Sequence, residues 1–487
     1  MKIKSDAFIR NPKDLWKGEP EHAEVRDISP HIGFNQITSD VVNSLENPRP
    51  IYWWAIAICI AMVGVGVACE VHQYRTGLGV SNKSNTNVWG VYIASFIFWV
   101  GVSHAGTLLS ALLHLTHSDW RKSVFRYAEA MTTFALMTAG LFVLVHLGRM
   151  WQVYYVMPYP NERGVWPNFQ SPLVWDMFVI GTYLTCSSIF LYTGMIPDLA
   201  VFRDNIHEGW RKKLYTFLAM GWQGTDRQWR NFRVAYLTLS VYLIILAVSG
   251  HSVVSSDFAM SQQPGWHITS FPPYFVVGAL YSGNAALITV FIILRYMFRY
   301  EEYLNMDVLR KLVRLTFALA MIWTYLHLIE MATVWYGHDT AARDQLYFKA
   351  TGVYAGWWWL FNFLAIVCPW VMAFRRWQTN LPVQMVLSLL LNVGMWLERW
   401  LIVAPTLGHS HYPWTFDFDQ WPSYIQWGIL FGSFGWFSLL ILIFCKVFPA
   451  VSMYELKELA YARKAELRHA HAEEGHGRPA LATKGAH

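Results

Sequence analysis

Charged residues are scarce in this chain of 487 residues. Asp, Glu, Lys and Arg make up 14% of it, whereas about a quarter is usual for a soluble globular protein. Hydrophobic residues make up 54%, and there are 26 Trp. Trp favours the headgroup region of a bilayer, where its ring has one wet edge. The composition therefore argues against an ordinary soluble protein and indicates one whose solvent is a lipid bilayer.

Cysteine is also scarce, and the five that occur all lie in or beside apolar runs: Cys59, Cys69, Cys186, Cys368 and Cys445. No two are close enough to form a CxxC pair. The spacing therefore argues against a zinc site, a CxxCH haem attachment and an iron–sulphur cluster held by this chain alone. Buried free thiols are the expected state. A cleavable leader is not expected either, because the first fifty residues are polar, so we expect the first membrane span to direct insertion.

Long apolar runs dominate the rest of the chain. A helix needs roughly 20 apolar residues to cross about 30 Å of hydrocarbon. Ten runs of this kind occur, near 51–70, 88–115, 128–149, 173–196, 234–255, 272–296, 314–336, 353–374, 382–403 and 423–446. They predict an all-α polytopic membrane protein with about ten transmembrane helices. Residues 1–50 form a polar N-terminal segment, 51–450 the membrane domain and 451–487 a charged, His-rich tail. We interpret that tail as solvated rather than metal-binding.

Lys and Arg are distributed unequally between the two ends of these spans. Cytoplasmic loops carry an excess of both residues. Of the 38 Lys and Arg, 31 lie in the two terminal segments and the loops on the same side, and six lie on the other side. This distribution predicts that both termini are cytoplasmic, which agrees with an even number of spans.

A short internal repeat relates the two halves of the membrane domain. Thr133-Phe-Ala-Leu precedes His146 in the third span, and Thr316-Phe-Ala-Leu precedes His327 in the seventh. The repeat predicts two four-helix bundles, spans 2–5 and spans 6–9, with spans 1 and 10 peripheral.

Several ionisable residues lie inside the predicted spans, where a charge costs about 2.5–3.5 kcal/mol on insertion scales. With the predicted orientation, most of them fall in the outer half of the membrane, and Glu129 alone lies towards the inner end of its span. The outer set comes from five spans: His146, Arg149, Asp176, His251, Asp257, His327, Glu330, Glu398 and Arg399.

Simpler explanations exist for individual members of this set. Asp176 follows Ser171-Pro172, an N-cap and a first-turn proline, so it could complement the helix dipole. Two pairs, His146 with Arg149 and His327 with Glu330, are three residues apart and share a helical face. The first pair would then be an interfacial anchor and the second a structural hydrogen-bonded pair.

Glu398 and Arg399 are adjacent, and therefore about 100° apart around a helix. This separation predicts different partners for the two side chains. Asp176 would be a natural ion-pair partner for Arg399, although sequence alone does not establish the pairing.

Histidine and carboxylate groups in a partly dry pocket suit proton acceptance, because both can bind and release a proton. An arginine there would hold a carboxylate charged or polarise a carbonyl oxygen, and apolar walls would admit a lipid-soluble substrate. Together these features favour quinol oxidation, in which two protons go to nearby bases and two electrons go to a carrier in another subunit.

Five stretches together resemble the NrfD-like (polysulphide reductase) family of membrane subunits. Within that family they are most similar to the ActC-type subunits of bacterial alternative complex III. The stretches cover spans 2 to 9: Ser103-His-Ala-Gly-Thr, His146-Leu-Gly-Arg, the loop from Pro158 to Asp176, Ser256-Asp-Phe-Ala-Met with Pro264-Gly-Trp-His267, and Trp396-Leu-Glu-Arg399.

The resemblance implies two four-helix bundles in the bacterial inner membrane and a menaquinol or ubiquinol site near the outer face. It also implies partners: an iron–sulphur subunit with a [3Fe-4S] cluster, multihaem cytochrome c subunits, a second NrfD-like subunit and small membrane subunits. We expect no haem or iron–sulphur cluster in this chain and no nucleic-acid partner.

Site residues are carried over from the resemblance as expectations. His146 and Asp176 would be catalytic, and the quinol would also contact Arg399, Asp257, Glu330 and Arg149. A coupled proton path would use Glu129, His104, His327, Glu398 and Asn392.

Three other functions are compatible with parts of the sequence. The chain could be a structural membrane anchor without a quinol site of its own. It could be a haem b cytochrome, with axial ligands from His104, His146, His251 or His327. Composition alone also fits a transporter, although the family motifs count against that function.

Overall fold

A computed structural model describes residues 32–83, 87–116, 118–157, 169–206, 208–261, 270–409 and 421–476. Within these ranges ten helices are long and apolar enough to cross a membrane, which confirms the predicted all-α polytopic fold. They are α2 (Ile51–Thr76), α3 (Gly90–Leu115), α4 (Arg121–Leu147), α5 (Pro172–Asn205), α7 (Asp226–Ser261), α8 (Phe271–Met297), α9 (Met306–Tyr336), α11 with η5 and η6 (Ala355–Asn362, Phe363–Val367 and Cys368–Ala373), α12 (Leu381–Gly408) and α13 (Tyr424–Val447).

Several helices are longer than the apolar runs predicted. α5 has 34 residues and α7 has 36, because helical hydrogen bonding continues where the side chains turn polar. The eighth span differs in another way, since α11 passes into a π-helical turn and then a 3₁₀ turn that contains Pro369. Proline has no N–H to donate and its ring crowds the preceding turn, which accounts for the broken α-helical pattern.

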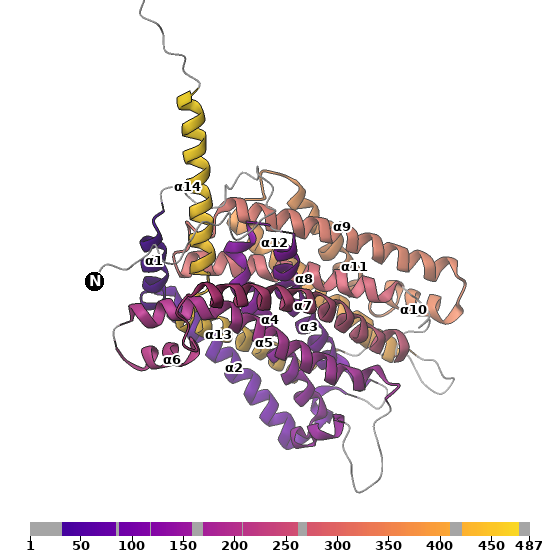
Figure 1. Ribbon diagram of the computed structural model, residues 1–487. Coiled ribbons are helices and arrows are strands. Elements are labelled where there is room, and N and C mark those ends of the chain that lie inside the picture. The colour runs from indigo at the N-terminus through magenta and orange to yellow at the C-terminus, as the bar shows by residue number, and fades with distance from the viewer. Residues whose placement is uncertain are drawn as a thin grey trace, which may run out of the picture.

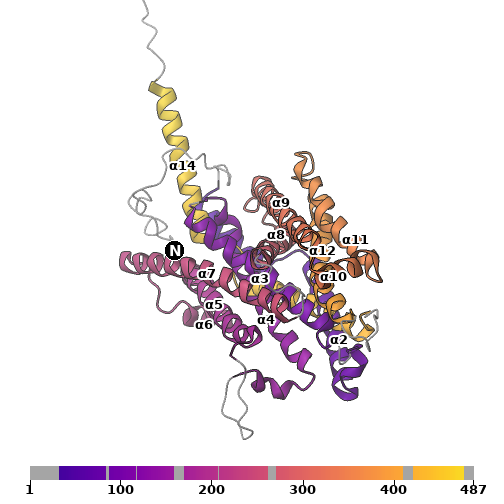
Figure 2. The same ribbon diagram turned by 90° about the vertical axis from the view of Figure 1, so that its right-hand side faces the viewer.

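Helix contacts divide the membrane domain into the two predicted four-helix bundles (Figure 1, Figure 2). The first bundle contains α3, α4, α5 and α7, and the second contains α8, α9, α12 and the α11 span. The bundles meet where α3 packs on α8 and α12, and α7 packs on α8. Almost all of the apolar stretch of α3 is buried, so α3 is the central helix of the molecule.

The first and last spans, α2 and α13, pack against each other along their length. Glycines permit this close approach, because a Cβ at Gly432 would lie 2.6 Å from the Cα of Gly66. Small residues drive helix association in membranes in this way. Most of α2 is exposed, as expected for a peripheral helix. α13 likewise lies outside the two bundles, although most of it is buried because it also packs on α4 and α3.

The remaining helices gather at the two ends of the bundles. α1 (Phe34–Glu46), α6 (Trp210–Leu218) and α14 (Met453–His476) lie at one end, called here the terminal end (Figure 1). η3 (Leu78–Ser81), η4 (Met150–Val156) and α10 (Thr340–Thr351) follow helices that run to the opposite end, called here the distal end. The charge distribution predicts that the distal end faces outward.

Some sequence predictions lie outside the described residues. These include most of the N-terminal segment, most of the loop motif between Pro158 and Asp176, and the stretch Pro264-Gly-Trp-His267.

Candidate functional site

His146 lies at the distal end of α4, next to a lysine from the loop after η3. The ammonium nitrogen of Lys83 is 3.0 Å from His146 Nδ1 and 3.2 Å from the His146 carbonyl oxygen. The same ammonium lies 4.7 Å from the centre of the Tyr92 ring. Both side chains are half-buried. The two contacts of the lysine with His146 help to hold the imidazole in place.

Gln73, near the end of α2, ties this group of side chains together. It donates to the Val145 carbonyl and to Glu70, both at 3.4 Å, and it accepts from the hydroxyl of Tyr92. Peripheral α2 therefore supplies side chains that hold the end of α4. Arg149, expected to share the face of His146, lies just before η4 and is exposed. The two residues diverge because α4 ends at Leu147 and Gly148 has a positive φ of 68°.

Asp176 and Asp257 form a second group, in which two buried carboxyl groups are hydrogen-bonded to each other. Asp176 lies one turn into α5, after Ser171 and Pro172 as predicted, and Asp257 lies near the end of α7. A carboxylate has only acceptors, so this hydrogen bond requires that one of the two groups carry a proton. The contact makes the pair a proton-sharing site.

His104 of α3 and His251 of α7 form a third group deeper in the first bundle. Their ring centroids are 4.6 Å apart, and His104 lies 4.8 Å from the ring of Tyr183. His104 Nδ1 donates a hydrogen bond to the Val100 carbonyl oxygen at 2.6 Å. All three side chains are buried.

Arg399 lies where the two bundles meet. Its guanidinium is beside Gly101 of α3 and Gly278 of α8. It contacts Glu398 directly and donates to the Met395 carbonyl at 3.0 Å. The prediction of different partners for Glu398 and Arg399 is therefore wrong, because long side chains span the angle between adjacent positions.

A cavity of about 40 Å³ opens between α8, α9, α10 and α12 in the second bundle. This volume is enough for a few water molecules. His327 on its wall is 3.4 Å from the Tyr274 hydroxyl and 3.1 Å from Asn362. The structure thus gives His327 partners other than Glu330, its expected partner. The polar wall consists of Tyr274, His327, Glu330, Gln345, Lys349 and Glu398.

Lys349 is a member of this cavity that the sequence reasoning missed. It comes from α10, which lies across the cavity, and it is buried beside Glu330. Burial lowers the pKa of Lys349 to about 8, and the Glu330 carboxylate partly offsets the effect. Lys83 and Lys349 are two of the few basic residues on the predicted outer side, which is the signal that could have found them.

Glu129 lies in a different environment, at the terminal end of the first bundle. It accepts hydrogen bonds from Tyr236 at 2.6 Å and Ser110 at 2.9 Å. Close by, Arg126 pairs with Asp198 at 3.0 Å, and both of these side chains are fully buried.

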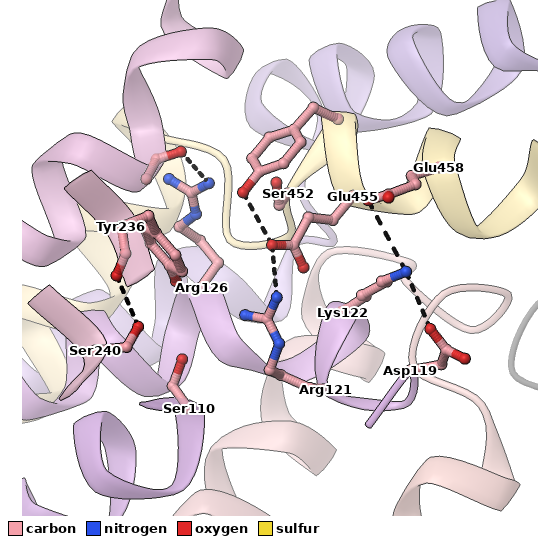
Figure 3. Close-up of polar contacts among 12 residues, drawn as sticks. Ser110, Asp119, Arg121, Lys122, Arg126, Tyr236, Ser240, Ser452, Glu455 and Glu458 are labelled. Atoms are coloured by element: carbon pink, nitrogen blue, oxygen red, sulfur yellow. Dashed lines mark hydrogen bonds and ion pairs between the residues drawn. The ribbon is translucent and has the colours of Figure 1, made fainter. Parts of the chain in front are cut away.

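The C-terminal helix α14 completes this network (Figure 3). Glu455 accepts from Arg121 at 2.9 Å, and Ser452 donates to Asp198 at 3.1 Å. The Tyr454 backbone N–H also donates to Asp198, at 3.1 Å. The start of α14 is therefore held to α4 by a buried ion pair and to α5 by hydrogen bonds to a buried carboxylate.

The expected outer-half residues do not form one cluster centred on His146, Asp176 and Arg399. Each of the three has a different partner: Lys83, Asp257 and Glu398 respectively. The ion pair considered between Asp176 and Arg399 is not the contact found. Asn392, half-buried on α12, donates to the Ser388 carbonyl at 2.8 Å. The positions of these residues are compatible with separate steps of one reaction or with separate roles.

The geometry argues against two of the ways in which the candidate histidines could hold a haem. His104 and His251 are in ring contact, which leaves no room for a porphyrin between them. His327 has a neighbour at each ring nitrogen.

Comparison with known proteins shows that this chain is similar to membrane subunits of reductase complexes. The family "Polysulphide reductase, NrfD" matches residues 79–408. A protein of Halobacterium salinarum, described as the C membrane subunit of a dimethyl sulfoxide reductase, is 27% identical over 50% of this chain and 51% of its own length.

Two further relatives show similar identity. The Hdr-like menaquinol oxidoreductase integral membrane subunit of Archaeoglobus fulgidus is 23% identical over 66% of this chain and 70% of its own length. The C subunit of the selenate reductase of Mesobacillus selenatarsenatis is 22% identical over 47% of this chain and 53% of its own length. The chain thus spans about half the length of two of the three relatives.

Proposed function

The chain belongs to the NrfD polysulphide reductase family, and we propose that it is the quinol-binding membrane subunit of a quinol-oxidising complex, of the ActC type found in alternative complex III. The contact between Asp176 and Asp257 is the observation that carries this proposal. Two buried carboxyl groups that share one proton can accept a second proton from a bound quinol.

The other distal groups would hold the substrate. His146 and Arg399 offer polar hydrogens to quinol oxygens, with Glu330 and Arg149 as further contacts. The spans that supply the site are apolar over most of their length, which suits a lipid-soluble ring and tail. Each turnover removes two protons and two electrons from the quinol and leaves a quinone.

The electrons must leave the subunit, since its sequence has no motif for a redox centre. We place the acceptor, a [3Fe-4S] cluster, in an iron–sulphur partner on the distal side, with multihaem cytochrome c subunits next in the chain of transfer. A second NrfD-like subunit and small membrane subunits would complete the complex. The name of the Archaeoglobus relative contains menaquinol, which favours that quinol over ubiquinol.

A proton path across the membrane would extend this function. Glu129 at the terminal end, His104 in the middle of the first bundle, and the groups His327, Glu398 and Asn392 in the second bundle are its proposed members. This arrangement requires the membrane orientation predicted from charge, with both termini in the cytoplasm of a bacterial cell.

The test is quinol oxidation by the assembled complex purified from membranes. Asp176→Asn and His146→Ala should lower the rate about 100-fold or more, because general acid–base groups contribute factors of about 10² to 10⁴. Asp204→Asn is the matched control, since it removes an exposed carboxylate at the terminal end.

Co-purification of partner subunits shows that each variant still assembles. Wild-type rates in both site variants would contradict the proposed site. If the purified complex also lacked quinone, the chain would be a structural anchor instead. A haem b spectrum in the isolated subunit would contradict the cofactor assignment.

A further inference from the structure

The ammonium nitrogen of Lys83 faces one of the two ring nitrogens of His146. A protonated lysine has three N–H donors and no acceptor. Its 3.0 Å contact with His146 Nδ1 therefore makes Nδ1 the acceptor. A neutral imidazole then carries its single hydrogen on Nε2. In this state the free edge of His146 donates a hydrogen bond and cannot receive a proton without becoming a cation.

A second cation at this position would be unfavourable. Imidazolium beside the ammonium of Lys83 would place two positive charges about 3 Å apart in a half-buried site, where like charges destabilise each other. His146 therefore cannot serve as the first base for quinol while Lys83 is charged. If Lys83 loses its proton, its amine accepts from Nδ1–H, and Nε2 becomes a base.

We propose that Lys83 is a positioning residue for quinol oxidation: charged, it holds His146 as a hydrogen-bond donor to the substrate oxygen, and neutral, it frees His146 to accept a proton. This inference rests on the proposed quinol site. It assigns the first quinol proton to the Asp176–Asp257 pair when Lys83 is charged. It gives His146 a base role only after Lys83 has lost its own proton.

The surroundings of Lys83 suit a group that changes charge near neutrality. Among the described residues, the titratable groups that face it are Glu70 from α2, Tyr92 from α3 and His146 from α4. Burial lowers the pKa of Lys83 to about 7, and Glu70 partly offsets that effect. The lysine is thus mostly charged below pH 7 and mostly neutral above it.

The lysine is also held in place, as a positioning residue must be. Its second contact, 3.2 Å to the His146 carbonyl, fixes it to the backbone of α4, while Tyr92 lies under the ammonium. Tyr92 is in turn bonded to Gln73, which also binds the Val145 carbonyl. The same network therefore fixes both members of the Lys83–His146 pair.

The experiment compares the pH dependence of quinol kcat/KM in assembled complexes that carry Lys83→Arg or Lys83→Met. Arginine keeps a donor for Nδ1 but does not lose its proton in this range. We expect wild type to gain activity between pH 6 and 8. Lys83→Arg should lose that rise and be about 10-fold slower than wild type at pH 8.5, with KM little changed at pH 6.

Lys83→Met should lose the same rise but also raise KM at pH 6, because nothing then holds the Nε2–H tautomer. Arg75→Met is the matched control, since it removes an exposed cation near the end of α2 and should keep the wild-type profile. In a His146→Gln background, Lys83→Met should cause no further change in the pH profile.

A wild-type pH profile in both lysine variants would overturn the role of Lys83, provided that His146→Ala and Asp176→Asn abolish activity. If those two variants keep wild-type rates, the proposed quinol site itself fails. The two failures are therefore distinguishable in one set of complexes. Co-purification of partner subunits and unchanged thermal unfolding exclude misfolding of the lysine variants.

Discussion

The two ends of the first bundle differ in how their ionisable groups are paired. At the terminal end each cation has an anion, as in Arg126 with Asp198 and Arg121 with Glu455. At the distal half, acidic groups meet acidic groups and basic groups meet basic groups: carboxyl with carboxyl, imidazole with imidazole, and an ammonium with an imidazole.

This difference separates charged groups that stabilise the fold from ionisable groups that can transfer protons. A complementary pair is neutral without gaining or losing protons, and breaking it leaves a buried charge alone. Like groups in contact avoid repulsion only by sharing or losing protons, which is what proton transfer requires. The distal half is therefore the part of the bundle suited to a reaction, and the terminal end is suited to fastening α14.

Replacing Asp257 should show the largest effect, and it tests most directly whether the distal carboxyl pair serves the reaction. In Asp257→Asn the amide keeps a hydrogen bond to Asp176 but holds no transferable proton. We expect quinol oxidation to fall about 100-fold or more, with thermal unfolding of the complex unchanged. A variant that loses stability but keeps its turnover would instead mark the carboxyl pair as structural.

The terminal pair should respond in the opposite way. Arg126→Met leaves Asp198 charged and buried, which costs about 3–5 kcal/mol of stability. The double variant Arg126→Met/Asp198→Asn should recover part of this loss, since Asn still accepts from Ser452 and from the Tyr454 N–H. Thermal unfolding in detergent measures both variants. Equal stability of the single and double variants would show that the loss does not come from an unpaired Asp198 carboxylate.

A smaller effect is expected at α10, where Lys349 is buried. Its pKa is lowered to about 8 in the folded protein, below the roughly 10.4 of an unfolded chain. Between these values the unfolded state binds more protons, so stability rises with pH across this window. Amide hydrogen exchange of residues 340–351, corrected for the intrinsic rate, should slow from pH 8 to 9.5. The same slowing in Lys349→Met would contradict this origin.

Most of the fold could be predicted from the chain itself. Ten apolar runs became ten candidate spans, and the repeat of Thr133-Phe-Ala-Leu at Thr316 correctly indicated two bundles. Helix ends were less predictable. α7, for example, continues through polar residues because its backbone hydrogen bonds do not depend on apolar side chains. The burial of α13 depended on its packing against α2, α4 and α3 together, and one sequence does not reveal which helices will pair.

For the candidate site, residue type was predictable and partnership was not. Asp176 and Asp257 were both selected because a carboxyl inside an apolar span is energetically costly and therefore indicates a specific role. Their mutual contact was not predictable, since it joins residues 81 positions apart. Glu398 and Arg399 were separated on helical geometry, although their flexible side chains meet. Lys83 and Lys349 were overlooked because they lie outside the apolar runs.

The sequence by itself determined that this chain spans a bilayer as ten helices, because hydrocarbon accepts only long apolar segments whose backbone groups bond internally. It also determined which spans carry ionisable groups. Only the tertiary structure decided that Asp176 faces Asp257 and that Lys83 faces His146, because a hydrogen bond depends on ångström distances between helices that no linear spacing encodes.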